Sequence, residues 1–284
     1  MLPTEYHQRI VDYYAATENA YKDSWDLNNS LAIHYGYRDK GVRTFADSLQ
    51  RMNAVMAESA GIREGETVLD AGCGVGGSSI FLAQHYGATV KGITLSPRQV
   101  QHAEINAEKK EVTGQVKFQL MDYCATDFPD HSFDVVWGCE SICYAANKEQ
   151  FIKEAYRLLR PGGRLVVADG LVTKYEHNRN PVIRQWLDGW QVNYLETADR
   201  FQGYMQQTGF SDIQFRDISR EVAHSSRRLL RFYYLANLYL YWKTITLSNR
   251  ATAMQKLNIR ACKFQYIGMK RNLWQYGLVT GWKL

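Results

Sequence analysis

The stretch that decides the fold is residues 68–77, which read Val-Leu-Asp-Ala-Gly-Cys-Gly-Val-Gly-Gly. The apolar run that ends at Asp70 predicts a buried strand, and the residues from Gly77 to about Tyr86 predict a helix. Glycines between a strand and a helix let the backbone turn sharply and approach a ligand closely. The stretch therefore predicts a ligand site at the carboxyl end of a strand.

On both sides of this turn, short β-branched runs alternate with longer helical patterns, which is typical of a parallel sheet with crossover helices. Ser96 is a favourable N-cap and Pro97 a favourable first residue for one of these helices. The predicted strands are residues 66–70, 88–93, 115–120, 133–137, 164–169, 212–218 and 273–284, and the predicted helices are 77–86, 97–110, 148–159 and 200–207. We therefore expect an α/β fold with a Rossmann-like, doubly wound, mostly parallel seven-stranded sheet.

Helical, aromatic-rich cap elements are expected around this core. Residues from Glu221 to about Arg271 have a largely helical pattern and are too many for an ordinary connection. The expected divisions are an N-terminal aromatic helical cap segment at 1–60, a core at 61–220, a basic helical cap insertion at 221–272 and a final core strand at 273–284. Ligands of open α/β sheets bind outside the carboxyl ends of the strands, so we expect the cap to cover that edge.

The positive charge is concentrated at the end of the chain. The 284 residues carry a net charge of +5, but residues 220–284 alone carry 12 lysines and arginines against one acid, Glu221. Such an asymmetry indicates an anionic ligand, an anionic membrane surface or nucleic acid, and a solvated basic face is the plainer alternative.

Other classes of protein are disfavoured by the composition. The sequence contains no run of about 18 or more apolar residues, so no transmembrane helix is predicted. The start, Met-Leu-Pro-Thr-Glu-Tyr-His, lacks the pattern of a signal peptide. The five cysteines are odd in number and lack zinc-ligand spacing. We therefore expect a reduced, cytoplasmic protein without a metal site of its own.

Three features near the glycine turn argue against a dinucleotide. Asp70 directly precedes the glycines, where its carboxylate can face the ammonium of a ligand. The second predicted strand ends in Thr94-Leu95-Ser96 instead of the acid that usually holds the NAD ribose. Asp122 and Tyr123, after the third strand, offer an acceptor for an adenine amine and a ring that can stack.

In these motifs the chain, from about residue 31 to 169, resembles the class I S-adenosylmethionine-dependent methyltransferases. It is most similar to their tocopherol, sterol, cyclopropane-fatty-acid and prenyl-diphosphate C-methyltransferases. The matching motifs are residues 68–79, 92–99, Asp122 with its neighbour, 133–137 and 160–164. The resemblance implies S-adenosylmethionine as cofactor, with its methionine part beside the glycines and its ribose and adenine beside the end of the second strand. The expected cofactor-binding residues are Asp70, Ala71, Gly72, Gly74, Thr94, Leu95, Gln99, Asp122, Tyr123 and Cys139.

Glu140 is the candidate for the chemistry. Residues 139–144, Cys-Glu-Ser-Ile-Cys-Tyr, resemble Asn-Glu-Ser-Thr-Met-Tyr of prenyl-diphosphate C-methyltransferases, and tocopherol and sterol methyltransferases also hold a Glu there. Methylation of an alkene carbon leaves a carbocation, which needs a general base to take its proton. An acid stabilised at a helix N-terminus is the structural alternative. Residues 34–37, His-Tyr-Gly-Tyr, resemble the His-His-Gly-Phe-Tyr stretch of tocopherol methyltransferases. The candidate catalytic residues are Glu140, Tyr144, His34 and Tyr37.

The substrate is expected to be an isoprenoid, most concretely a prenyl or isopentenyl diphosphate, whose methylation would belong to terpene biosynthesis. Arginines suit an oxyanion and aromatic faces suit a cation. The candidate substrate-binding residues are Tyr14, Tyr35, Arg227, Arg228, Arg231 and Tyr234. Mg²⁺ is expected only together with a diphosphate. The alternatives are O-, N- or ring C-methylation of a lipid or natural product such as a quinol, a tocopherol-like molecule, a sterol or an amine. Nucleic acid is not expected as a partner, because no Asn-Pro-Pro-Tyr-type signature follows the fourth strand; peripheral membrane contact and a homo-oligomer stay open.

Overall fold

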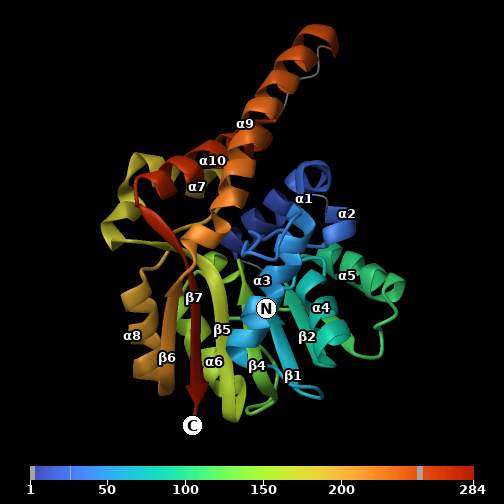
Figure 1. The fold of residues 1–284 in the computed structure, drawn as a ribbon, viewed down its shortest axis with the longest axis vertical. Coiled ribbons are helices and arrows are strands. Elements are labelled where there is room, and N and C mark those ends of the chain that lie inside the picture. The colour runs from blue at the N-terminus through green and yellow to red at the C-terminus, as the bar shows by residue number, and fades with distance from the viewer. Residues whose placement is uncertain (1–3, 26, 248–251) are drawn as a thin grey trace.

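The computed structural model describes residues 4–25, 27–247 and 252–284. Its seven strands form one sheet in the order β3-β2-β1-β4-β5-β7-β6 (Figure 1). Strands β1 to β5 are parallel, whereas β7 is antiparallel to both β5 and β6. The strands are β1 (Thr67–Ala71), β2 (Thr89–Thr94), β3 (Val116–Leu120), β4 (Phe133–Cys139), β5 (Leu159–Val172), β6 (Phe210–Asp217) and β7 (Trp274–Lys283). The expected Rossmann-like, mostly parallel seven-stranded sheet is confirmed.

Helices cover both faces of the sheet because successive strand residues point to opposite sides. Val68 belongs to one apolar cluster with α3, α4 and α5, and its neighbour Leu69 belongs to a second cluster with α6 and α8. The helices are α1 (Glu5–Trp25), α2 (Leu27–Ser30), α3 (Phe45–Ala60), α4 (Gly77–Tyr86), α5 (Pro97–Lys109), α6 (Lys148–Leu158), α7 (Pro181–Gly189), α8 (Ala198–Thr208), α9 (Ser219–Leu247) and α10 (Ala253–Lys270). None of them, within the residues described, is long and apolar enough to span a bilayer.

A helical cap of α1, α2, α7, α9 and α10 lies beyond the carboxyl ends of the parallel strands (Figure 1). Helix α3 lies outside this cap because it packs on the sheet next to α4, so the cap part of residues 1–60 ends before α3. Residues 181–189 fall within the expected core at 61–220, yet they form helix α7, which packs against α10 in the cap. The helical insertion after β6 consists of α9 and α10, and its residues 248–251 lie outside the described part of the chain.

Buried polar contacts hold the cap together. The amide of Asn258 on α10 donates to the hydroxyl of Tyr13 on α1 at 2.7 Å. The Tyr35 hydroxyl donates to Oε1 of Gln265 at 2.8 Å, and the Ser226 hydroxyl donates to the same oxygen at 2.7 Å. Residues from both ends of the chain therefore meet in one layer.

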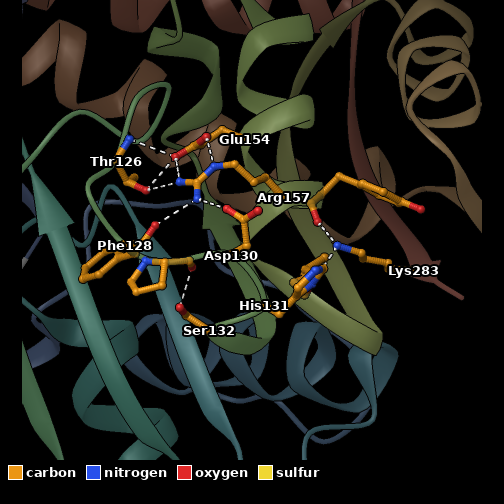
Figure 2. Close-up of polar contacts among 11 residues, drawn as sticks. Thr126, Phe128, Asp130, His131, Ser132, Glu154, Arg157 and Lys283 are labelled. Atoms are coloured by element: carbon orange, nitrogen blue, oxygen red, sulfur yellow. Dashed lines mark hydrogen bonds and ion pairs between the residues drawn. The ribbon is translucent and has the colours of Figure 1, made fainter.

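A second polar cluster fixes the loop between β3 and β4 (Figure 2). The Arg157 guanidinium on α6 donates to the Phe128 carbonyl at 2.9 Å and to Oε1 of Glu154 at 2.7 Å. The same carboxylate oxygen accepts hydrogen bonds from the amide and the hydroxyl of Thr126, at 2.9 and 2.6 Å. These contacts anchor the loop that begins at Asp122, next to the ligand cavity described below.

Candidate active site

A cavity of about 870 Å³ lies over the carboxyl ends of β1, β2 and β4. The glycine turn after β1 forms one wall, and α1 with the segment before α3 forms the opposite wall. Its polar lining includes two carboxyl groups, one imidazole and several hydroxyl groups. These polar residues are His34, Asp70, Ser78, Thr94, Ser96, Gln99, Tyr123, Glu140, Ser141, Tyr14 and Tyr144.

The glycine turn is shaped by close backbone approach. Gly72 has φ +94°, and a Cβ at this position would lie 2.4 Å from the Cβ of Ser141. A Cβ on Gly77 would lie 2.0 Å from the carbonyl oxygen of Leu31, which belongs to the wall opposite. Any larger residue at either position therefore displaces one wall of the first cavity.

Asp70 provides a buried carboxyl group in the first cavity. Its side chain is almost completely buried, and its Oδ2 accepts a hydrogen bond from the Ser79 hydroxyl at 2.6 Å. Burial raises the pKa of Asp70 to about 6, against the opposing effect of the bond from Ser79. The group is therefore mostly ionised at neutral pH, and it can accept hydrogen bonds from a cationic ammonium.

The end of β2 forms the second polar edge of this cavity. The Thr94 hydroxyl donates to Oε1 of the Gln99 side chain at 2.6 Å. The Ser96 hydroxyl accepts a hydrogen bond from the backbone N–H of Gln99, as the N-cap of α5. Across the cavity, the Tyr123 hydroxyl donates to the Ser141 carbonyl at 2.7 Å. The capping bonds fix the Gln99 backbone and side chain at a site suited to a ribose and a purine.

His34 lines the first cavity and has an unpaired hydrogen-bond acceptor. Its Nδ1 lies 2.9 Å from the Tyr35 carbonyl oxygen, so Nδ1 carries the hydrogen and Nε2 is a lone-pair acceptor. Nε2 is buried and has no hydrogen-bond partner among the described residues. Burial lowers the pKa of His34 to about 4, so the ring is neutral at pH 7.

A second cavity of about 670 Å³ adjoins the first under the cap. Both are lined by Tyr14, Ile33, Glu140 and Tyr144, which therefore lie where the two meet. Aromatic rings dominate the second cavity, and the described residues that line it include no Lys, Arg or His. These rings belong to Tyr14, Trp25, Tyr35, Tyr144, Trp186, Trp190, Trp274 and Tyr276.

Glu140 is held rigidly at this junction. Its φ of +49° is in the left-handed region, and its amide donates to the Ala168 carbonyl at 2.9 Å. Its Oε1 accepts hydrogen bonds from the Tyr276 hydroxyl, at 2.6 Å, and from the Tyr35 amide. Burial nevertheless raises the pKa of Glu140 to about 8, with a smaller contribution from the buried carboxyl of Asp169. A carboxyl group with this pKa can exchange a proton near neutral pH.

The sequence of this chain matches known proteins. Residues 69–167 match the family model described as a methyltransferase domain. The chain is 38% identical over 212 residues to 2-methyl-6-phytyl-1,4-hydroquinone methyltransferase of Synechocystis sp., a match that covers 69% of this chain and 65% of that protein. It is 30% identical to 27-O-demethylrifamycin SV methyltransferase of Amycolatopsis mediterranei, over 71% of this chain and 75% of that protein. The chain belongs to the class I S-adenosylmethionine-dependent methyltransferases.

Further comparisons give one more relative in sequence and two solved structures that are similar to this methyltransferase. It is 34% identical to sterol 24-C-methyltransferase of Saccharomyces cerevisiae, over 63% of this chain and 47% of that protein. The cyclase SpnF superposes with a TM-score of 0.80 at 21% identity, covering 99% of this chain and 98% of that one. Geranyl diphosphate C-methyltransferase from Streptomyces coelicolor superposes with a TM-score of 0.76 at 19% identity, over the full length of both chains. At these identities the two solved structures support the fold alone.

The first cavity of the methyltransferase fits the cofactor S-adenosylmethionine. Asp70 and the free acceptor of His34 suit the ammonium of its methionine part, and a Cβ at Gly74 would meet no atom within 4 Å, so the glycine turn leaves space for a ligand there. Eight of the expected cofactor-binding residues line this cavity: Asp70, Gly72, Gly74, Thr94, Leu95, Gln99, Tyr123 and Cys139. Of the other two, Ala71 belongs to the apolar cluster under α6, and Asp122 lies outside the cavity lining. Oδ1 of Asp122 accepts from the Cys124 amide at 2.8 Å.

The structure places some of the expected catalytic and substrate-binding residues in the cavities and the others outside them. Glu140, Tyr144, Tyr14 and His34 line the first cavity, and all of these except His34 also line the second, with Tyr35. Tyr37 lies outside both cavities, because its amide bonds to the Ser48 carbonyl at 2.8 Å beside α3. The remaining four lie exposed on α9 and line neither cavity: Arg227, Arg228, Arg231 and Tyr234.

Sequence reasoning missed several residues of the second cavity. Tyr276 on β7 bonds Glu140, and Asp169 at the end of β5 supplies a second carboxyl group, whose pKa burial raises to about 6. Buried Lys148 donates to the carbonyl oxygens of Cys143, Ala145 and Tyr194, each at 2.9 Å, and so ties together two segments around the cavity. None of these positions belongs to a recognisable motif, so no local signal identified them.

The raised pKa of Glu140 predicts a proton released by cofactor binding. The carboxyl group is mostly protonated near neutral pH, and the sulfonium charge of bound S-adenosylmethionine lowers its pKa. S-adenosylhomocysteine lacks that charge but keeps the ammonium that we expect beside Asp70. We therefore expect calorimetry in buffers of different ionisation enthalpy to show more protons released by S-adenosylmethionine than by S-adenosylhomocysteine. The variant Glu140→Gln is expected to abolish the difference, and an equal release by both ligands in the wild type would contradict this assignment.

Proposed function

We propose that this methyltransferase adds a methyl group to an alkene carbon of an isoprenoid lipid, most concretely a prenyl diphosphate, with Glu140 as the general base. The observation that carries the proposal is the position of Glu140 at the junction of a cofactor cavity and an aromatic-lined cavity that also contains Asp169. Among the relatives, the name of the sterol enzyme specifies methylation at carbon.

The residues around the junction suit each step of such a reaction. S-adenosylmethionine supplies an electrophilic methyl group when it is bound. The alkene π pair forms the new carbon–carbon bond, which leaves a cation on the neighbouring carbon of the substrate. The faces of Tyr14, Tyr144 and the tryptophans stabilise that cation, and the Glu140 carboxylate removes a proton from an adjacent carbon to restore the alkene. Because the base must be ionised and the bound sulfonium lowers its pKa from about 8, methyl transfer is expected to rise with pH and to level off below pH 8.

No described Lys, Arg or His lines the second cavity, so the cations that bind a substrate diphosphate must lie outside it. Arg228 lies close to this cavity, since its guanidinium is 6.0 Å from the ring centre of Trp25, which lines the cavity. The same guanidinium lies 4.3 Å from the ring centre of Phe45. A prenyl diphosphate is therefore expected to place its hydrocarbon among the rings and its anionic end, with any Mg²⁺, toward α9.

The role of Arg228 can be measured with paired substrates. We expect Arg228→Gln to raise the KM for a prenyl diphosphate about two- to fivefold, because the guanidinium is exposed and its electrostatic contribution is screened by water. The KM for S-adenosylmethionine and for the corresponding neutral prenol should not change. Arg260→Gln on α10 removes the same charge elsewhere and serves as the control. Equal effects of the two variants on the diphosphate KM would argue against this role.

A second candidate is methylation of a phenolic lipid at oxygen or at a ring carbon. One observation favours it: the name of the 38% identical relative specifies a hydroquinone. Incubation with methyl-labelled cofactor and parallel sets of prenyl diphosphates, sterols, quinols and amines separates the candidates. Label transferred only to quinols or amines would overturn the alkene proposal.

A further inference from the structure

The second half of α9 projects from the body of the protein (Figure 1). The first half is anchored, because Val222, Ser225, Ser226 and Leu229 are buried under the cap. After Leu229 no described residue of this helix is buried. We call residues 230–242 of α9 the α9 arm; its length at 1.5 Å per residue is about 20 Å.

The α9 arm carries a continuous apolar stripe on its exposed surface. Tyr234, Leu238 and Tyr241 are spaced by four and three residues, so they lie on one face of the helix. Leu235 lies at the margin of the same face, and the exposed fractions of the four side chains run from 56% for Leu238 to 66% for Leu235. A solvated helix normally exposes polar residues, so this face is suited to contact with another surface.

Basic residues continue the same stripe toward the body of the protein. Arg227 and Arg231 precede Tyr234 by seven and three residues, and both side chains are exposed. The chain from residue 222 to residue 284 contains 11 lysines and arginines and no aspartate or glutamate. The surface that the arm contacts is therefore expected to be anionic as well as apolar.

We propose that the α9 arm binds the surface of an anionic lipid membrane. Tyrosine and tryptophan prefer the interface between lipid and water, because their rings are apolar and their polar atoms stay hydrated. Leucine side chains enter the acyl boundary, and nearby arginines attract anionic headgroups. The arm begins directly after Leu229, which lines the second cavity, so the arm connects the membrane surface with the site where a lipid substrate would be methylated.

Vesicle sedimentation of the full chain tests the proposal. The wild type is expected to bind phosphatidylcholine–phosphatidylserine vesicles, to bind pure phosphatidylcholine more weakly, and to be released by high salt. The triple variant Tyr234→Ser, Leu238→Ser and Tyr241→Ser should lower the affinity about tenfold or more, since it removes the stripe. The double variant Arg227→Gln and Arg231→Gln should remove most of the preference for phosphatidylserine.

The control is Ile105→Ser, which replaces an exposed apolar residue on α5, far from the arm in the fold, and should bind vesicles as the wild type does. Circular dichroism and the affinity for S-adenosylhomocysteine establish that each variant is folded. A wild type that does not bind vesicles, or a triple variant that binds as well as Ile105→Ser, overturns the proposal. It is also overturned if light scattering shows a wild-type oligomer that the triple variant dissociates while vesicle binding is absent, because the stripe then contacts a second copy of the chain.

Discussion

Replacement of Glu140 by glutamine is expected to lower the turnover of methyl transfer to an alkene by about 10²- to 10⁴-fold, the range for loss of a general base. The side-chain carbonyl oxygen of the glutamine can still accept the hydrogen bonds that Glu140 Oε1 receives from the Tyr276 hydroxyl and the Tyr35 backbone N–H. The fold and the cofactor affinity should therefore persist. Single-turnover assays with labelled cofactor measure the rate, and calorimetry with S-adenosylhomocysteine measures the affinity.

The products of the Glu140→Gln variant provide an independent readout. A cation that is not deprotonated by Glu140 loses a proton from another carbon or captures water, so isomeric alkenes or alcohols are expected. Tyr276→Phe is the matched second variant, because it removes one hydrogen bond to the carboxyl group and leaves the base in place. Its turnover should fall much less. Near-normal turnover of Glu140→Gln on the true substrate would show that deprotonation by this residue is not part of the reaction.

Replacement of Asp70 by asparagine is expected to raise the Kd for S-adenosylhomocysteine about 10- to 100-fold, as for the loss of a charge-assisted hydrogen bond in a buried site. The amide keeps the shape of the side chain and can accept the bond from Ser79. Asp134→Asn, which lies outside both cavities, is the control and should leave the Kd unchanged. An affinity within twofold of the wild type would exclude a charge interaction between Asp70 and the cofactor.

The same substitution has a defined effect on stability. Because the pKa of Asp70 is raised to about 6 in the folded state, the folded protein binds this proton more tightly than the unfolded chain. The stability from this group is therefore present at low pH and is lost as the pH rises through about 6. Asp70→Asn does not ionise, so its Tm at pH 8 should be no lower than that of the wild type, and weakened binding cannot then be attributed to unfolding.

Local patterns predicted the core well. The helix predicted at 77–86 coincides with α4, and Ser96 caps α5 as expected, because turns and caps depend on neighbouring residues. Strand β5 is longer than the predicted strand at 164–169: it begins at Leu159, which pairs with Phe133, and runs to Val172. The cofactor site follows the same logic, since its residues lie at the ends of consecutive strands.

The second cavity depends on long-range packing that no local pattern encodes. Tyr276 reaches Glu140 across 136 residues because β7 runs antiparallel beside β5, with Tyr276 paired to Gly170. The aromatic spacing of α9 also did not reveal which face is buried. Tyr234 was expected beside the substrate, yet it is 60% exposed on the arm, whereas the buried residues of α9 lie in the first half of the helix.

The most direct test of the central claim is a reaction with trideuteromethyl-labelled S-adenosylmethionine and a panel of prenyl diphosphates and sterols, analysed by mass spectrometry and NMR. The account predicts a product in which the intact labelled methyl group is bonded to carbon and one substrate proton is lost, and Glu140→Gln should form much less of it. A product labelled only at oxygen, formed equally well by Glu140→Gln, would contradict the account.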